Sequence, residues 1–115
     1  VFVRPSRYTY KLFTEQSIFT LSFFERKYRD KLSYLGNHSG RDEDKVKKCN
    51  LTPITTKENG VTYSEARLVF VCKKIYEQDL LPENISEQIK TRFYLQNEYH
   101  RMFVGEIIQC LESEE

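Results

Sequence analysis

The residues with the clearest chemistry are arginines and hydroxyl side chains gathered near the start of the chain: Arg4, Ser6, Arg7, Tyr8 and Thr9. They follow a short apolar segment and precede a predicted helix, whose first turn offers unbonded N–H groups and the positive end of a dipole. Guanidinium groups pair with phosphate oxygens in bidentate geometry. The cluster therefore predicts a phosphate-binding site. The alternative is a solvent-exposed turn in which a hydroxyl group caps the helix.

A second polar segment, GNHSGRDEDK, occupies residues 36–45. Gly40 permits a positive φ or a close approach of the backbone to a ligand, and Arg41 and Lys45 are cations beside acidic residues such as Asp42. The glycine spacing and the Lys-Ser/Thr pair of a P-loop are both missing. The segment is either a ligand-binding loop, or a surface loop followed by a short helix whose charges pair with one another.

A third candidate is His100, which stands between Tyr99 and Arg101 at the start of a predicted strand. A histidine in this place is functional if it faces the same cleft as the two polar segments, and is otherwise an idle, partly exposed residue. Gly105, further along the same predicted strand, marks a bulge or a close approach of backbone or ligand.

Several reaction classes have no support in the sequence. There is no nucleophile-elbow motif and no His-x-x-x-His pair, and Cys49, Cys72 and Cys110 lack metal-ligand spacing. We therefore expect three reduced thiols in a cytoplasmic protein, and no metal site. The polar groups suit a cofactor that carries its own reactivity, with the protein supplying binding and orientation.

Short strands separated by brief helices and turns must position these residues. Apolar patterns predict the end of a buried strand at residues 1–3 and an interior strand at 17–24. Ser6 or Thr9 is expected to cap the first helix, and Gly36 to end the second. The fold class is mainly β with short helices (α+β), antiparallel or barrel-like. The predicted strands are 1–3, 17–24, 51–56, 61–65, 66–76 and 99–111, the predicted helices are 10–16, 25–35 and 42–48, a turn lies at 58–60, and 79–97 is mixed loop with one helical turn.

Composition narrows the remaining possibilities. A chain of 115 residues makes one domain, and no apolar run approaches the roughly 20 residues that span a bilayer. Eighteen Lys and Arg against 17 Asp and Glu give a net charge of +1, which argues against a strongly basic nucleic-acid-binding protein. The chain begins with Val1 and its only methionine is Met102, so we expect it to be a piece of a longer protein.

Six segments follow one another in an order that is typical of one known family: FVRPSRYTY, FTLSFF, LGNHSGRDEDKV, LTP, ARLVFVCKKIYEQDL and YHRMFVGEI. In this order they resemble the flavin reductase-like, flavoredoxin-type proteins, from Val1 to about Ile108. The resemblance implies an antiparallel, Greek-key FMN-binding split β-barrel, with a single domain at residues 1–111 and a frayed acidic tail at 112–115. The family's N-terminal segment, which carries early barrel strands, has no counterpart here, so we expect a barrel that is incomplete at its N-terminus.

The resemblance also implies which residues contact the phosphate of FMN. The family's Arg-x-x-x-Tyr-Thr stretch lies at that phosphate and matches Arg4, Tyr8 and Thr9, with Ser6 and Arg7 between them. These five residues are therefore predicted to bind the cofactor.

Other residues are implied to lie near the flavin ring. Lys45 is expected to stabilise the anionic reduced ring, and His100 matches the family histidine on the flavin and nicotinamide side; these two are the candidate catalytic residues. Ser22, in a core strand, is predicted to reach the flavin. The residues that match the family's Gly-x-x-x-Gly-Arg-Asp-x-Asp-Lys stretch along the ring are Gly36, Gly40, Arg41, Asp42, Asp44 and Lys45.

The implied activity is that of an FMN-dependent oxidoreductase, which transfers electrons between NADH or NADPH, flavin and another acceptor. The resemblance implies a cytoplasmic homodimer with FMN at the subunit interface, and neither nucleic acid nor membrane as a partner. One alternative is a non-catalytic flavin-binding or protein-interaction module of the same fold. Another is nucleic-acid binding through residues 4–11, which the nearly balanced charge disfavours.

Overall fold

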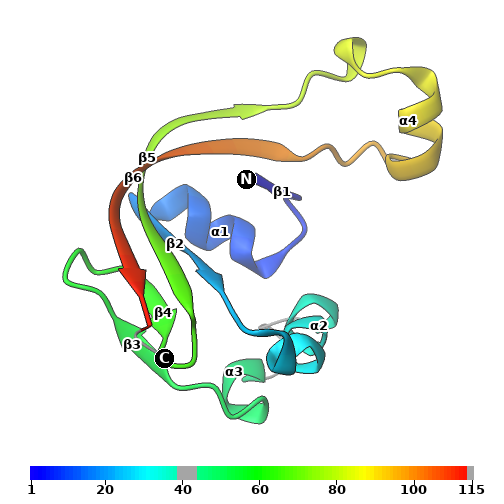
Figure 1. Cartoon of the computed structure of the whole chain (residues 1–115). Helices are drawn as coiled ribbons and strands as arrows, with labels where there is room; N and C mark the ends of the chain where they lie inside the picture. The colour runs from blue at the N-terminus through cyan, green and yellow to red at the C-terminus, as the bar shows by residue number, and fades with distance from the viewer. Residues whose placement is uncertain (39–43, 114–115) are drawn as a thin grey trace.

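The computed structural model describes residues 1–38 and 44–113, and its main feature is a four-stranded antiparallel sheet (Figure 1). A separate two-stranded antiparallel hairpin lies beside the sheet. The predicted class, mostly β with short helices, is therefore confirmed. The strands of the larger sheet, in spatial order, are β1 (Phe2–Val3), β6 (Arg101–Glu112), β5 (Leu68–Asp79) and β2 (Ile18–Phe23), and those of the hairpin are β3 (Pro53–Thr55) and β4 (Val61–Tyr63).

Short helices connect these strands. No helix in the described part of the chain has the length and apolar character needed to cross a membrane. The helices are α1 (Tyr8–Glu15), the 3-10 helix η1 (Arg26–Tyr28), α2 (Arg29–Asn37), α3 (Lys45–Lys48), the 3-10 helix η2 (Pro82–Asn84) and α4 (Glu87–Phe93).

The long strands β5 and β6 form the centre of the molecule. Val69, Val71 and Cys72 of β5 are buried, and the strand has neighbours on both edges, β6 and β2. The register between β5 and β6 shifts twice, between Val71 and Cys72 and between Lys74 and Tyr76. In Figure 1 the two strands curve and extend past β2, and the connection between them carries α4 at its far end.

Helix α1 is fixed on the sheet by aromatic packing and by a lysine. The Phe13 ring lies 5.0 Å from that of Phe19 on β2 and 5.2 Å from that of the fully buried Phe103 on β6. Lys74 Nζ on β5 donates hydrogen bonds to the carbonyl oxygens of Phe13 (2.8 Å) and Thr14 (3.2 Å), in the last turn of the helix. Carbonyl groups at a helix C-terminus need such partners. The position of α1 also fixes the arginine-rich segment just before it.

The predicted turn at residues 58–60 is confirmed. Asn59 adopts a positive φ of 65°, as asparagine does more readily than most residues. The backbone N–H of Thr56 donates to the Gly60 carbonyl oxygen (2.7 Å), and the Thr56 hydroxyl oxygen accepts from Gly60 N–H (2.9 Å). These bonds close the hairpin of β3 and β4.

Two predictions about strand position are wrong. β1 is not the end of a buried strand, since the Phe2 side chain is 59% exposed. β2 pairs only with β5 and is an edge strand of the described sheet, not an interior one. An apolar pattern identifies side chains that favour burial, but the pairing of distant segments decides which strand ends at the edge.

Helix boundaries also differ from the predictions. α1 begins at Tyr8, and its N-cap is Arg7 with no side-chain cap, so neither Ser6 nor Thr9 has the predicted capping role. α2 continues through Gly36 to Asn37, and therefore Gly36 is not a C-terminal cap.

Three further segments differ from the predictions. The helix predicted at residues 42–48 is observed at Lys45–Lys48, while its predicted start lies outside the described residues. The predicted loop at 79–97 contains η2 and the two-turn helix α4, in which the Ser86 hydroxyl oxygen accepts from Ile89 N–H (3.4 Å). β6 includes Glu112, the first residue of the predicted frayed tail.

Candidate functional site

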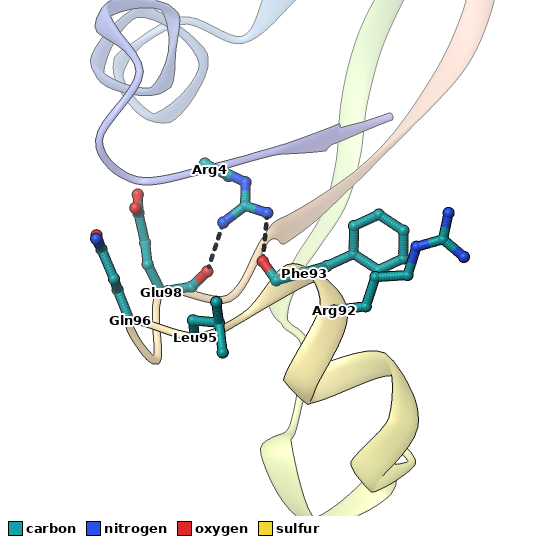
Figure 2. A pocket seen from close by; sticks show the side chains of 6 residues that line it. All are labelled: Arg4, Arg92, Phe93, Leu95, Gln96 and Glu98. Carbon is teal, nitrogen blue, oxygen red and sulfur yellow. Dashed lines mark hydrogen bonds between the residues drawn. The ribbon is translucent and has the colours of Figure 1, made fainter.

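Arg4 lies just after β1 and reaches the loop between α4 and β6 (Figure 2). Its guanidinium donates hydrogen bonds to the carbonyl oxygens of Phe93 (2.8 Å) and Glu98 (3.2 Å), and it stands 5.1 Å from the centre of the Tyr94 ring in a cation–π contact. A guanidinium carries five N–H donors. Arg4 therefore braces the α4–β6 loop and keeps donors for an anion.

The Glu98 carboxylate lies close to the start of α1. It accepts a 2.6 Å hydrogen bond from the backbone N–H of Ser6. Hydrogen bonding to the side chain and backbone of Ser6 lowers the pKa of Glu98, and the nearby charge of Arg4 lowers it further. Glu98 is thus ionised at neutral pH, and an incoming phosphate would meet this negative charge beside the cations.

The start of α1 is suited to an anion. The N-cap residue, Arg7, has an extended backbone, no side chain caps the helix, and no acidic residue lies in the first turn. The Arg7 guanidinium donates to the Gly36 carbonyl oxygen at 3.1 Å, which joins the start of α1 to the last turn of α2. Arg4 and Arg7 thus flank the start of a helix that has no acidic residue in its first turn, which is compatible with the anion site predicted from the sequence.

His100 joins Arg4, Tyr94 and Glu98 in one group of neighbouring residues, called the Arg4 cluster below. Its Nδ1 atom lies 2.6 Å from the Tyr94 hydroxyl, and the two rings meet edge to face at 5.6 Å. Burial lowers the pKa of His100 and so does the charge of Arg4, while Glu98 acts in the opposite direction. The imidazole is therefore mostly neutral at pH 7.

The remaining predicted site residues have other surroundings. Thr9 lines a cavity of about 460 Å³ between α1, β2 and the β3–β4 turn. Ser22 lies on β2, outside the Arg4 cluster. Its hydroxyl is hydrogen-bonded to that of Thr62 on β4 (2.7 Å). Tyr8 is partly exposed in the first turn of α1. Lys45 is the first residue of α3, and Asp44 directly precedes it.

Gly40, Arg41 and Asp42, which were predicted to border the flavin ring, lie outside the described residues. Within residues 1–38 and 44–113, no group of His, Cys, Asp and Glu side chains could hold a metal ion. Cys49, Cys72 and Cys110 are unpaired thiols, and burial raises the pKa of Cys72.

A cavity of about 190 Å³ adjoins Arg4 (Figure 2). The Arg92 side chain points away from Arg4 and stacks on Phe93, with its guanidinium 5.1 Å from the ring centre. Typical ligand pockets measure roughly 300–1,000 Å³, so this cavity would hold part of a ligand. Its lining residues are Arg4, Arg92, Phe93, Leu95, Gln96 and Glu98.

Several solved structures share this arrangement of strands and helices. Flavoredoxin of Desulfovibrio vulgaris (Miyazaki F) matches with a TM-score of 0.72 and 25% identity, over 97% of this chain and 51% of its own. An FMN-binding protein from Thermus thermophilus matches with a TM-score of 0.74 and 20% identity, over 99% and 54%. A flavin reductase with a split-barrel domain from Shewanella frigidimarina matches with a TM-score of 0.73 and 17% identity, over 99% and 50%. The chain has the fold of the flavin reductase-like split-barrel proteins.

The resemblance predicted from the six ordered segments is thereby confirmed. This chain spans about half the length of the split-barrel structures that it matches. No family model and no curated protein matches the sequence.

Two residues beside Arg4 were missed in the sequence. Tyr94 and Glu98 lie in the loop that carries His100, but neither belongs to a recognisable motif. The signal in the sequence is Asn97, because asparagine favours tight turns. In the structure Asn97 has a positive φ of 59° and donates its N–H to the Tyr94 carbonyl oxygen (3.1 Å). This turn returns the chain so that the Tyr99 ring lies 4.8 Å from that of Tyr94.

We expect acidification to destabilise the protein in two stages. The pKa of His100 is below its ordinary value of 6.5, so its contribution to stability is complete above pH 6.5 and is lost as the pH falls through the folded-state value. The pKa of Glu77 is lowered by the hydrogen bond from Lys74, and that of Glu98 by Ser6. Both carboxylates therefore contribute stability that is lost as the pH falls below their ordinary pKa of 4.5. Urea denaturation at several pH values would measure both stages.

The variant His100→Gln is the control for the first stage. It should remove the pH dependence between neutrality and about pH 5 but keep the loss at lower pH. A stability that increases as the pH falls would contradict the prediction.

Proposed function

We propose that the protein is an FMN-dependent oxidoreductase of the flavin reductase or flavoredoxin type, with one domain at residues 1–111. It would transfer electrons between NADH or NADPH, flavin and a further acceptor. The observation that carries the proposal is the match of nearly the whole chain to a flavoredoxin and to an FMN-binding protein. When bound, FMN supplies the hydride and electron chemistry, and the protein supplies binding and orientation.

In this proposal different residues of the chain bind the phosphate and contact the flavin ring. Arg4, Arg7 and the first-turn N–H groups of α1 hold the phosphate, assisted by the hydroxyl groups nearby. Lys45 places a positive charge at the ring edge, where it favours the reduced state. His100, which is neutral at pH 7, offers a hydrogen-bonding group on the side of the nicotinamide.

We also propose a cytoplasmic homodimer. Apolar side chains are exposed on β5 and at the end of α4, including Ile75, Tyr76, Phe93 and Leu95. Large exposed apolar surfaces usually mark an interface, and a second copy of the chain would cover them. A monomer mass in light scattering over a range of concentrations would contradict the dimer.

Titration with FMN tests the proposed function. Arg4→Ala removes a charge-assisted phosphate contact, so binding should weaken by about 1.5–3 kcal/mol, or roughly 10- to 150-fold. Arg92→Ala is the matched control, because Arg92 lines the same cavity but stacks on Phe93, and it should leave the affinity nearly unchanged. Glu98→Gln removes the neighbouring negative charge and should tighten binding.

Circular dichroism must show that the variants fold, because Arg4 also holds the α4–β6 loop. A wild-type protein that ignores FMN would overturn the proposed function. An FMN affinity that is equal in wild type and Arg4→Ala would overturn the role of Arg4.

A non-catalytic flavin-binding or protein-interaction module is the second candidate. It is favoured by the match to a Thermus thermophilus protein that is described only as FMN-binding. Tight FMN binding without oxidation of NADH or NADPH, tested with free flavin, ferric chelates and disulfides as acceptors, would support this module over the enzyme.

A further inference from the structure

Tyr94 is a buried tyrosine at the end of α4, with an exposed fraction of only 8%. Three groups hold its ring in place. The Arg4 guanidinium stands 5.1 Å from the ring centre, the Tyr99 ring packs at 4.8 Å, and the His100 ring meets it edge to face at 5.6 Å. Because the ring is confined, its hydroxyl stays within hydrogen-bond distance of His100 Nδ1, at 2.6 Å.

The direction of this hydrogen bond follows from the needs of the hydroxyl group. Among the described residues, His100 is the one hydrogen-bond partner of the Tyr94 hydroxyl. If Nδ1 were the donor, the hydroxyl hydrogen would lack an acceptor within the described chain, and an unsatisfied polar group in a buried place costs free energy. The arrangement in which Tyr94 donates satisfies both groups. Nδ1 can accept only when the ring proton is on Nε2.

We propose that Tyr94 is a positioning residue, which holds His100 in the neutral Nε2–H tautomer and so makes the imidazole a hydrogen-bond donor. The identity of the acceptor rests on the proposed function. In the FMN enzyme, the acceptor would be a group of the bound flavin.

The charged groups around His100 are compatible with a neutral ring. Burial disfavours the charged ring most, the positive charge of Arg4 adds to this effect, and Glu98 opposes it. Tyr94 adds a hydrogen bond that only the neutral ring can accept. The ring is therefore kept neutral by its surroundings, and Tyr94 decides which nitrogen carries the proton.

NMR of the flavin-free protein tests the tautomer. The chain has two histidines, His38 and His100, and the variant His38→Gln assigns their ring signals. Long-range ¹H–¹⁵N spectra above the pKa should show His100 with its proton on Nε2. In Tyr94→Phe the neutral ring loses its hydrogen bond, so the Nδ1–H form should become populated and the pKa of His100 should rise by about 0.4–1 pH unit.

Tyr99→Phe is the matched control. It removes a hydroxyl from the adjacent ring, which interacts with Asn97 and not with His100, and it should leave the tautomer and the pKa unchanged. Wild-type His100 with its proton on Nδ1 would overturn the inference. Unchanged His100 signals and pKa in Tyr94→Phe would overturn it as well.

Titration of the same labelled protein with FMN separates this inference from the proposed function. If the Nε2–H tautomer is present and FMN does not bind, the role of Tyr94 stands and the proposed function fails. If FMN binds and the tautomer is Nδ1–H, the proposed function stands and the role of Tyr94 fails. When both hold, FMN should shift the Nε2–H signal of His100 in the wild type.

Discussion

Replacing Phe103 with alanine should destabilise the protein by about 3–5 kcal/mol, the largest effect that we expect from one substitution. Phe103 is fully buried between the sheet and α1, where its ring lies 5.2 Å from that of Phe13 and 6.4 Å from that of Tyr10. Lys74 Nζ stands 5.7 Å from its centre. Alanine would leave a cavity between rings that cannot close it without moving α1.

Urea denaturation would measure this loss. Domains of this size have a total stability of about 5–15 kcal/mol, so Phe103→Ala is expected to be close to unfolding, and the milder Phe103→Leu serves as a second variant. Phe2→Ala is the control, because Phe2 is mostly exposed and its loss should cost less than about 1 kcal/mol. Equal losses for Phe2→Ala and Phe103→Ala would show that Phe103 is not central to the core.

Replacing Gly105 with alanine should also destabilise the protein, by at least about 1–3 kcal/mol. A Cβ atom at this position would lie 2.5 Å from Cζ and 2.8 Å from Cε1 of Phe19, and 2.9 Å from Cβ of Cys72. The Phe19 ring cannot yield easily, because Phe13 packs against it at 5.0 Å. Insertion of one methyl group would therefore force apart β6, β2 and the helix above them.

Gly36→Ala is the matched control for Gly105→Ala, because the chemical change is the same. Gly36 lies inside α2 and a Cβ atom there would meet nothing within 4 Å. Alanine has the higher helix propensity, so Gly36→Ala should stabilise the protein by about 0.5–1 kcal/mol. Thermal or urea denaturation should give changes of opposite sign, and two changes of the same sign would refute the comparison.

At Gly105 the structure shows both a bulge in the neighbouring strand and a close approach, and the approaching group is the Phe19 side chain. Gly105 was predicted to mark either a bulge or the close approach of a backbone or ligand. The register of β5 and β6 shifts between Lys74 and Tyr76, opposite Gly105, and the space above Gly105 is taken by Phe19. The glycine therefore leaves room for the Phe19 ring above β6. Phe19 in turn packs against Phe13 of α1, so Gly105 supports the position of α1 indirectly.

Features that depend on near neighbours could be predicted from the sequence. The unbroken apolar run in β5 predicts a buried strand, because it needs no partner to be recognised. Asn59-Gly60 predicts a hairpin turn from the φ preferences of two residues. The order of six motifs indicates the fold family even though no single motif is decisive. The anion site at residues 4–9 stays a prediction.

Features that depend on pairing between distant segments were decided by the tertiary structure. Arg4 can bond the carbonyl group of Glu98, 94 residues away, because β1 pairs with β6, and this pairing also brings Tyr94 and His100 to the arginine. β2 became an edge strand for the same kind of reason, because an apolar pattern records a preference for burial and not the identity of the neighbour. The sequence by itself therefore determined the strands, the turn and the arginines. The tertiary structure decided that a tyrosine, a histidine and a glutamate stand beside them.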